Sequence, residues 1–211
     1  MGLIVNFFNK IFKRSSDIDK NITSAPHIEA KYNSDEPINC EKLTDIDIDK
    51  HEVQLDIASD IGQIKKSYDF IVKVLLLGIT SSGKSSLSTR FVDNTFDHMH
   101  METKGVEFKI KNVKCDNKII KMQLWDTSGH SKFFAITRAY YRGTTIFILT
   151  YDVTNENGLL DLEKFKEDLY NYSSGESLIV LVACKCDLID KRKITTEEGK
   201  KYAASNNLKY F

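Results

Sequence analysis

The sequence lacks the features of a membrane-spanning or secreted protein. No apolar stretch approaches the ~20 residues needed to span a bilayer, and the apolar run at 3–8 is too short for a secretory signal. Basic and acidic residues number 30 each, so the total charge argues neither for nor against nucleic acid. We expect no nucleic acid among the partners. Of the 4 cysteines, two form a Cys-Lys-Cys whose spacing does not suit a zinc knuckle. Reduced thiols in a cytosolic protein are therefore expected.

The first 14 residues have the pattern of an amphipathic membrane anchor. A basic helix with phenylalanines suits an anionic membrane surface. Gly2 is a candidate for myristoylation, although Asn6 stands where the motif usually has Ser or Thr. The alternative is a helix that packs on the folded domain. The apolar residues at helical spacing are Leu3, Ile4, Phe7, Phe8, Ile11 and Phe12.

Residues 15–68 show no sustained hydrophobic period. The only two prolines of the chain, Pro26 and Pro37, lie here among Asn, Ser, Asp and Lys. Such a composition buries too little apolar surface to offset the entropy lost on ordering. We therefore expect a disordered, acidic and polar linker that precedes a folded domain at 69–211.

The segment from residue 69 onward alternates strand-like and helix-like patterns. This alternation predicts an α/β domain with a mostly parallel sheet flanked by helices and joined by right-handed crossovers. Ligands of such sheets bind at the carboxyl ends of the strands. The expected strands are 74–77, 106–115, 118–125, 146–151 and 178–184, and the expected helices are 84–92, 159–170 and 196–205.

The segment Gly78–Ser85 has the sequence Gly-x-x-x-x-Gly-Lys-Ser between an apolar run and a helix start. Such a P-loop directs backbone N–H groups and a helix dipole at phosphates. Gly78 and Gly83 permit a close approach that a Cβ would block. Lys84 can reach the β- and γ-phosphates, and the Ser85 hydroxyl can hold Mg²⁺. A chance glycine turn is the alternative. Three more serines complete the expected nucleotide contacts: Ser81, Ser82 and Ser86.

Three further positions complete a nucleotide and metal site. Asp126 ends an expected strand, where its carboxylate can join the Mg²⁺ shell, and Thr103 lies in a polar loop and can add a hydroxyl. Gly129 can bring a backbone N–H to a γ-phosphate. Lys185 and Asp187 follow another strand, and an Asp carboxylate there can accept the N1 and 2-amino hydrogens of guanine, which adenine lacks.

With these motifs in place, residues 69–211 resemble a Rab-type small GTPase of the Ras superfamily. The resemblance implies a P-loop NTPase fold and a vesicle-trafficking switch that alternates between GTP and GDP, peripheral on the cytosolic face of an endomembrane. It also implies effector proteins, an exchange factor and a GTPase-activating protein as partners, and switch loops at 97–107 and 129–141. The matching blocks are 104–108, 121–129, 140–143 and 151–155.

The resemblance also assigns aromatic residues. Phe96 matches the ring that packs against guanine. Phe108, Trp125 and Tyr140 match the aromatic triad with which Rabs meet effectors, and ordinary core packing is the alternative for that triad.

Several positions depart from the family pattern. Cys184 stands where an Asn ties the base to the P-loop, and a thiol is a weak donor and acceptor. His130 stands where a Gln orients the attacking water, which implies slow hydrolysis, although a solvent-facing residue without a catalytic role is the alternative. Ser81 and Ser82 replace the usual Gly-Val.

Catalytic competence therefore stays open at this point, with Lys84, Thr103 and His130 as the candidates. One interpretation is a slow or partner-dependent GTPase. The other is a pseudo-GTPase that recruits effectors without useful turnover. The chain ends inside the last expected strand, at Phe211, so we expect a C-terminally incomplete domain whose final helix is missing.

Overall fold

The computed structural model describes residues 68–97, 102–115, 118–173 and 177–211. The predicted anchor at 1–14, its Gly2, and all of the predicted linker except Tyr68 lie outside the described residues. The chain divides into two compact units, one of 1–69 with 112–120 and one of 70–111 with 121–211. In the first unit, the Asp69 N–H donates to the Ile119 carbonyl (2.7 Å), and the Ile119 N–H donates to Asp69 Oδ2 (2.6 Å).

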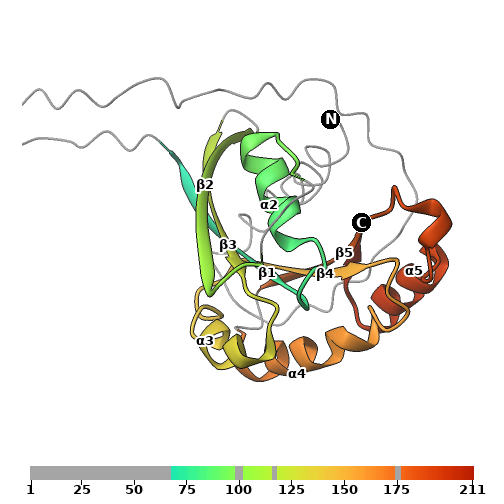
Figure 1. The fold of residues 1–211 in the computed structure, drawn as a ribbon. Coiled ribbons are helices and arrows are strands. Elements are labelled where there is room, and N and C mark those ends of the chain that lie inside the picture. The colour runs from blue at the N-terminus through green and yellow to red at the C-terminus, as the bar shows by residue number, and fades with distance from the viewer. Residues whose placement is uncertain (1–67, 98–101, 116–117, 174–176) are drawn as a thin grey trace, which may run out of the picture. The chain divides into compact units, whose positions relative to one another are not determined.

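The described elements alternate strands and helices, as the sequence pattern predicts (Figure 1). The strands are β1 (Phe70–Leu77), β2 (Val106–Cys115), β3 (Lys118–Thr127), β4 (Ile146–Asp152), β5 (Leu178–Cys184) and β6 (Lys209–Tyr210). The helices are α2 (Lys84–Asp93), α3 (Phe134–Arg138), α4 (Glu163–Tyr172) and α5 (Thr196–Ser205), with 3-10 turns η1 (Ser131–Phe133), η2 (Leu160–Leu162) and η3 (Ile189–Lys191).

The sheet has six strands in the order β2-β3-β1-β4-β5-β6. The pairs β1–β4, β4–β5 and β5–β6 are parallel, with Leu77 opposite Leu149, Asp152 opposite Cys184, and Leu181 opposite Tyr210. Parallel strands are covered on both faces and therefore form continuous apolar runs, which is the pattern of β4, where six of seven residues are buried. The expected α/β fold with a mostly parallel sheet is confirmed.

The helices cover the two faces of the sheet unequally. In Figure 1, α2 lies on one face, and α3, α4 and α5 lie on the opposite face. The core on the second face combines residues of β1, β4 and β5 with Phe165 and Leu169 of α4 and Ala203 of α5. Burial of these apolar side chains provides the main driving force for this packing. It also fixes the carboxyl ends of β1, β4 and β5, where the loops of the site begin.

The elements differ from the expected ones mainly at their ends. The strand expected at 74–77 begins at Phe70, and the helix expected at 159–170 begins as the turn η2 and ends at Tyr172. The region expected only as a switch loop contains η1 and α3. These two elements total too few residues to show a helical period in the sequence.

Candidate functional site

The loop between β1 and α2 is shaped by close backbone approach. A Cβ on Gly78 would lie 2.5 Å from the Thr150 carbonyl oxygen, and one on Gly83 would lie 2.8 Å from the Cβ of Cys184. Gly83 also has a φ of 99°, which side chains disfavour. Ser81 adopts a φ of 63° despite its Cβ, a left-handed conformation that costs roughly 1–2 kcal/mol. The two glycines of the predicted P-loop are therefore required by space and conformation.

Lys84, at the start of α2, places a buried cation in this loop. The residue is 5% exposed, and its Nζ donates to the carbonyls of Gly78 (3.0 Å) and Ile79 (2.8 Å). Desolvation lowers the pKa of Lys84 to about 8, although Asp126 nearby opposes the shift. A buried cation whose charge is costly to hold favours an anionic ligand, as a phosphate-binding role requires.

The three residues predicted to hold Mg²⁺ come from three segments, and each has a buried side chain with oxygen atoms that can bind a metal ion. Ser85, Thr103 and Asp126 are 9%, 9% and 2% exposed. Ser85 Oγ and Thr103 Oγ1 lie 2.8 Å apart. Adjacent ligands of an octahedral Mg²⁺ with bonds of 2.0–2.1 Å lie about 2.9 Å apart. The hydroxyl pair therefore fits two neighbouring positions of one Mg²⁺ shell, and a carboxylate is the other ligand type that this ion prefers.

The loop after β3 touches the P-loop through backbone atoms. A Cβ on Gly129 would lie 2.1 Å from the Thr80 nitrogen and 2.2 Å from the Ile79 carbonyl carbon. The next residue, His130, is exposed, and its Nδ1 accepts a hydrogen bond from the Lys132 N–H (3.3 Å) at the start of η1. The imidazole thus contacts its own loop, and the acceptor role of Nδ1 leaves Nε2 as the nitrogen that bears hydrogen.

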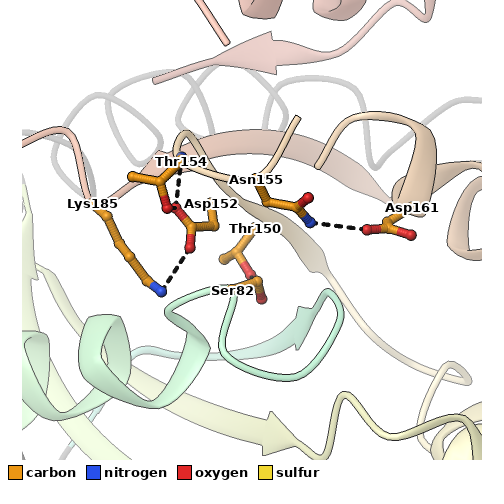
Figure 2. Close-up of polar contacts among 7 residues, drawn as sticks. All are labelled: Ser82, Thr150, Asp152, Thr154, Asn155, Asp161 and Lys185. Atoms are coloured by element: carbon orange, nitrogen blue, oxygen red, sulfur yellow. Dashed lines mark hydrogen bonds and ion pairs between the residues drawn. The ribbon is translucent and has the colours of Figure 1, made fainter. Parts of the chain in front are cut away.

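The segment after β5 carries the predicted base-reading residues. Lys185 has a φ of 61°, and its Nζ lies 2.7 Å from Asp152 Oδ2, as Figure 2 shows. Burial alone would raise the pKa of Asp152, but hydrogen bonds from Lys185 and Thr154 outweigh it and lower that pKa. Asp187 is exposed, and Phe96 is 56% exposed. Both are therefore open to solvent, and their predicted contacts with guanine stay predictions.

Cys184, at the end of β5, lies directly behind the P-loop. Its Sγ would be 2.9 Å from a Cβ on Gly83. Burial raises the pKa of the Cys184 thiol to about 12, so the sulfur is protonated at neutral pH. A neutral thiol is a weak hydrogen-bonding group. Where the family pattern has an asparagine amide, this chain therefore has a neutral thiol that packs closely against the P-loop.

The predicted aromatic triad forms one surface on the sheet. The rings of Phe108 and Trp125 have centroids 4.7 Å apart, and those of Trp125 and Tyr140 are 5.1 Å apart. Phe108 is 45% exposed, so this ring is not simply part of the core. Lys73 of β1 lies over the Trp125 ring, and its Nζ donates to the Tyr140 carbonyl (2.6 Å) and the Arg142 carbonyl (2.9 Å).

The helix α3 is held against α4 by residues that the sequence did not single out. Arg138 binds Asp168 through two contacts, Nε–Oδ2 at 2.9 Å and Nη2–Oδ1 at 2.8 Å. Phe134 and Phe165 meet edge to face at 5.1 Å between centroids. Bidentate pairs of this kind fix geometry as well as charge. The partners lie far apart along the chain, so no local pattern reveals them.

A mostly parallel α/β sheet with a P-loop after its first strand is the architecture of a P-loop nucleotide-binding protein, and comparison with known sequences agrees with this class. Residues 73–211 match the Ras family. The chain therefore belongs to the Ras family of small GTPases.

Within that family the chain is similar to Ras-related Rab proteins, among others. The chain is 42% identical over 146 residues to Ras-related protein Rab-1 of Theileria annulata, which covers 69% of this chain and 66% of the relative. It is 38% identical over 147 residues to GTP-binding protein YPT1 of Saccharomyces cerevisiae (70% and 71% covered). It is 37% identical over 145 residues to Ras-related protein Rab-8A of Gallus gallus (69% and 70%). The chain thus spans about two thirds of the length of these relatives. In the described part of the chain, no helix is both long and apolar enough to cross a membrane.

Proposed function

We propose that the protein is a Rab-like molecular switch that binds GTP and GDP with Mg²⁺ and acts in membrane trafficking. The observation that carries this proposal is the combination of buried Lys84, the 2.8 Å hydroxyl pair of Ser85 and Thr103, and buried Asp126, whose charge acts on Lys84. A cation for the phosphates and three oxygen donors for Mg²⁺ are the groups that phosphoryl transfer in this class requires.

The other parts of the proposal rest on the position of each residue relative to this loop. Gly129 would direct its N–H at a γ-phosphate, since its backbone already contacts the P-loop. Asp187 would read guanine, with Lys185 and Phe96 beside the base. The surface of Phe108, Trp125 and Tyr140 would receive effectors, because a partly exposed cluster of large rings is typical of recognition surfaces.

We propose further that hydrolysis is slow without a partner. His130 would occupy the position from which the attacking water is oriented, but its Nδ1 is engaged by the Lys132 N–H. That contact turns the imidazole toward its own loop. The same contact favours the second candidate function, a pseudo-GTPase that holds nucleotide and recruits effectors without useful turnover.

Nucleotide binding by the purified full-length chain tests the proposal. The protein would be loaded with fluorescent GDP and then challenged with GTP, GDP or ATP, with and without EDTA. We expect competition by GTP and GDP alone, and faster release when EDTA removes Mg²⁺. Displacement by ATP as effective as that by GTP, or release that EDTA does not change, would contradict the proposal.

A pair of variants in α2 tests the metal assignment. Ser85→Ala removes the hydroxyl that pairs with Thr103, whereas Ser88→Ala removes another buried hydroxyl one turn later, which has no hydrogen-bond partner among the described residues. We expect Ser85→Ala to release nucleotide quickly with or without EDTA, and Ser88→Ala to behave like the wild type. If Ser85→Ala keeps the EDTA response, Ser85 does not hold the metal. Single-turnover hydrolysis by wild-type protein then separates the slow GTPase from the pseudo-GTPase.

A further inference from the structure

Two buried hydroxyls connect the P-loop to the neighbouring strand β4. Ser82 lies within the loop and Thr150 within β4, and both are 0% exposed. Ser82 Oγ and Thr150 Oγ1 are 2.7 Å apart (Figure 2), and Thr150 Oγ1 donates to the Leu77 carbonyl at 3.3 Å. A hydroxyl has one hydrogen to donate, so Ser82 donates to Thr150 and Thr150 donates to Leu77.

This chain of hydrogen bonds connects Ser82, within the P-loop, to the residue that immediately precedes the loop. Leu77 is the last residue of β1 and immediately precedes Gly78, where the loop begins. The backbone of Gly78 runs directly against the two hydroxyls, because a Cβ there would lie 2.6 Å from each of their oxygens. Hydrogen bonds in series polarise and strengthen one another in a buried environment. The loop conformation therefore depends on a side chain of β4.

The residue on the other side of the loop does not provide such a connection. Among the described residues, the Cys184 thiol makes no hydrogen bond, and its contact with Gly83 is one of close packing. Its raised pKa keeps it neutral. The only side-chain hydrogen bond from Ser82 in the described part of the chain thus runs to β4.

We propose that Ser82 and Thr150 act together as a positioning pair that holds the P-loop closed and thereby slows nucleotide release. The inference rests on the proposed function, since it concerns release of the guanine nucleotide. Neither residue is proposed to touch the reacting atoms. Their hydroxyls would set the loop geometry that Lys84 and the backbone N–H groups require.

The two hydroxyls make unequal contributions, which gives the proposal a specific signature. Thr150→Val keeps the shape of the side chain but leaves the Ser82 hydroxyl buried without its acceptor and the Leu77 carbonyl without its donor. Ser82→Ala leaves the bond from Thr150 to Leu77 in place. In the double variant, truncation at residue 82 makes room for the methyl at residue 150, since carbon atoms pack at about 3.5–4.0 Å. Replacing both partners by apolar groups is nearly neutral, whereas an orphaned buried group is costly.

The test is the release rate of fluorescent GDP from the full-length protein with Mg²⁺ present. We expect about tenfold faster release for Thr150→Val, from the cost of one orphaned buried hydroxyl, and about threefold for Ser82→Ala, from the loss of one neutral hydrogen bond. The double variant should release more slowly than Thr150→Val alone. Thr144→Val is the matched control, because Thr144 is also buried and donates one hydrogen bond, to the Tyr140 carbonyl at 2.9 Å, away from the P-loop.

A merely structural role would lower the melting temperature of Thr150→Val and Thr144→Val alike and would leave both release rates at the wild-type value. That result would overturn the inference. So would a double variant that releases faster than Thr150→Val, because the two hydroxyls would then act independently. Wild-type protein that retains no guanine nucleotide would overturn the proposed function, and with it this inference, before any variant is measured.

Discussion

Replacing Gly129 by Ala should lower the affinity for GTP much more than the affinity for GDP. The space at this position is occupied by the Ile79–Thr80 peptide, with the Thr80 nitrogen at 2.1 Å and the Ile79 carbonyl carbon and oxygen at 2.2 and 2.6 Å from the new Cβ. Gly129 does not have a positive φ, so alanine is conformationally allowed there and only space opposes it. Because backbone atoms cannot rotate away as a side-chain end can, the two loops must part.

The size of the effect follows from the distance. Cβ contacts below 3.0 Å essentially do not occur, so the loop after β3 must move away from the P-loop by about 1 Å. A shift of 1 Å is enough to disrupt a hydrogen bond to a bound group. A hydrogen bond to a charged group contributes about 1.5–3 kcal/mol, which corresponds to roughly 10- to 150-fold in affinity. GDP has no γ-phosphate, so its affinity should change little.

The assay compares dissociation constants for fluorescent GTP and GDP analogues in the wild type and two variants. Gly143→Ala is the control, because Gly143 has a φ of 70° and no atom within 4 Å of a new Cβ. That variant introduces backbone strain without a clash and should lower the melting temperature while keeping the GTP-to-GDP affinity ratio. An unchanged ratio in Gly129→Ala would refute the assignment of the Gly129 N–H to the γ-phosphate.

Three further predictions concern charge, the switch region and the N-terminus. Lys84 loses its proton above about pH 8 in the free protein, whereas bound phosphates would favour the protonated lysine. Nucleotide binding above pH 8 should therefore be accompanied by uptake of a proton. Affinity should then fall by up to tenfold per pH unit above pH 8, and a pH-independent affinity in titrations from pH 7 to 9.5 would contradict this. Asp168→Asn should speed hydrogen exchange in α3, because it breaks the bidentate contact with Arg138. The control Lys166→Ala removes an exposed ion pair and should leave exchange in α3 unchanged. Equal exchange rates in the two variants would refute the role of the Arg138–Asp168 contact. Deleting residues 1–14 should abolish sedimentation with anionic liposomes at low salt, and deleting 20–33 should not; liposome binding that survives the first deletion would exclude the anchor.

The strands and longer helices were predictable because their signals are local. β5 and α5 have the expected bounds. α5 begins with a capping box in which Thr195 and Glu198 satisfy each other's backbone N–H groups. The shape of the P-loop was predictable for a similar reason, since it consists of consecutive backbone groups whose geometry is set by two glycines. The short helix α3 was not predicted, because long-range contacts of Phe134 and Arg138 stabilise it.

The motifs predict candidate site residues one by one, but they do not predict the network of contacts around them. The motifs identify Lys84, Ser85, Thr103 and Asp126, and the structure brings them to one loop. The support behind these residues is invisible to the sequence: Ser82 and Thr150 are 68 positions apart. A single threonine in an apolar strand gives no local sequence signal of a role in the site. Its position next to the P-loop follows only from the strand order, in which β4 lies beside β1.

The contacts of Lys73 give β1 a double role. The carboxyl end of the strand leads into the P-loop, and its Lys73 donates to the Tyr140 and Arg142 carbonyls, which follow α3, while it lies over the Trp125 ring. Burial lowers the pKa of this lysine, and its two acceptors help to hold the charge. A single strand therefore connects the P-loop with the aromatic surface. A movement of the Tyr140 backbone would either break the hydrogen bond between its carbonyl and the Lys73 ammonium or displace the lysine with it. Lys73 therefore couples the strand that leads into the P-loop to the aromatic surface.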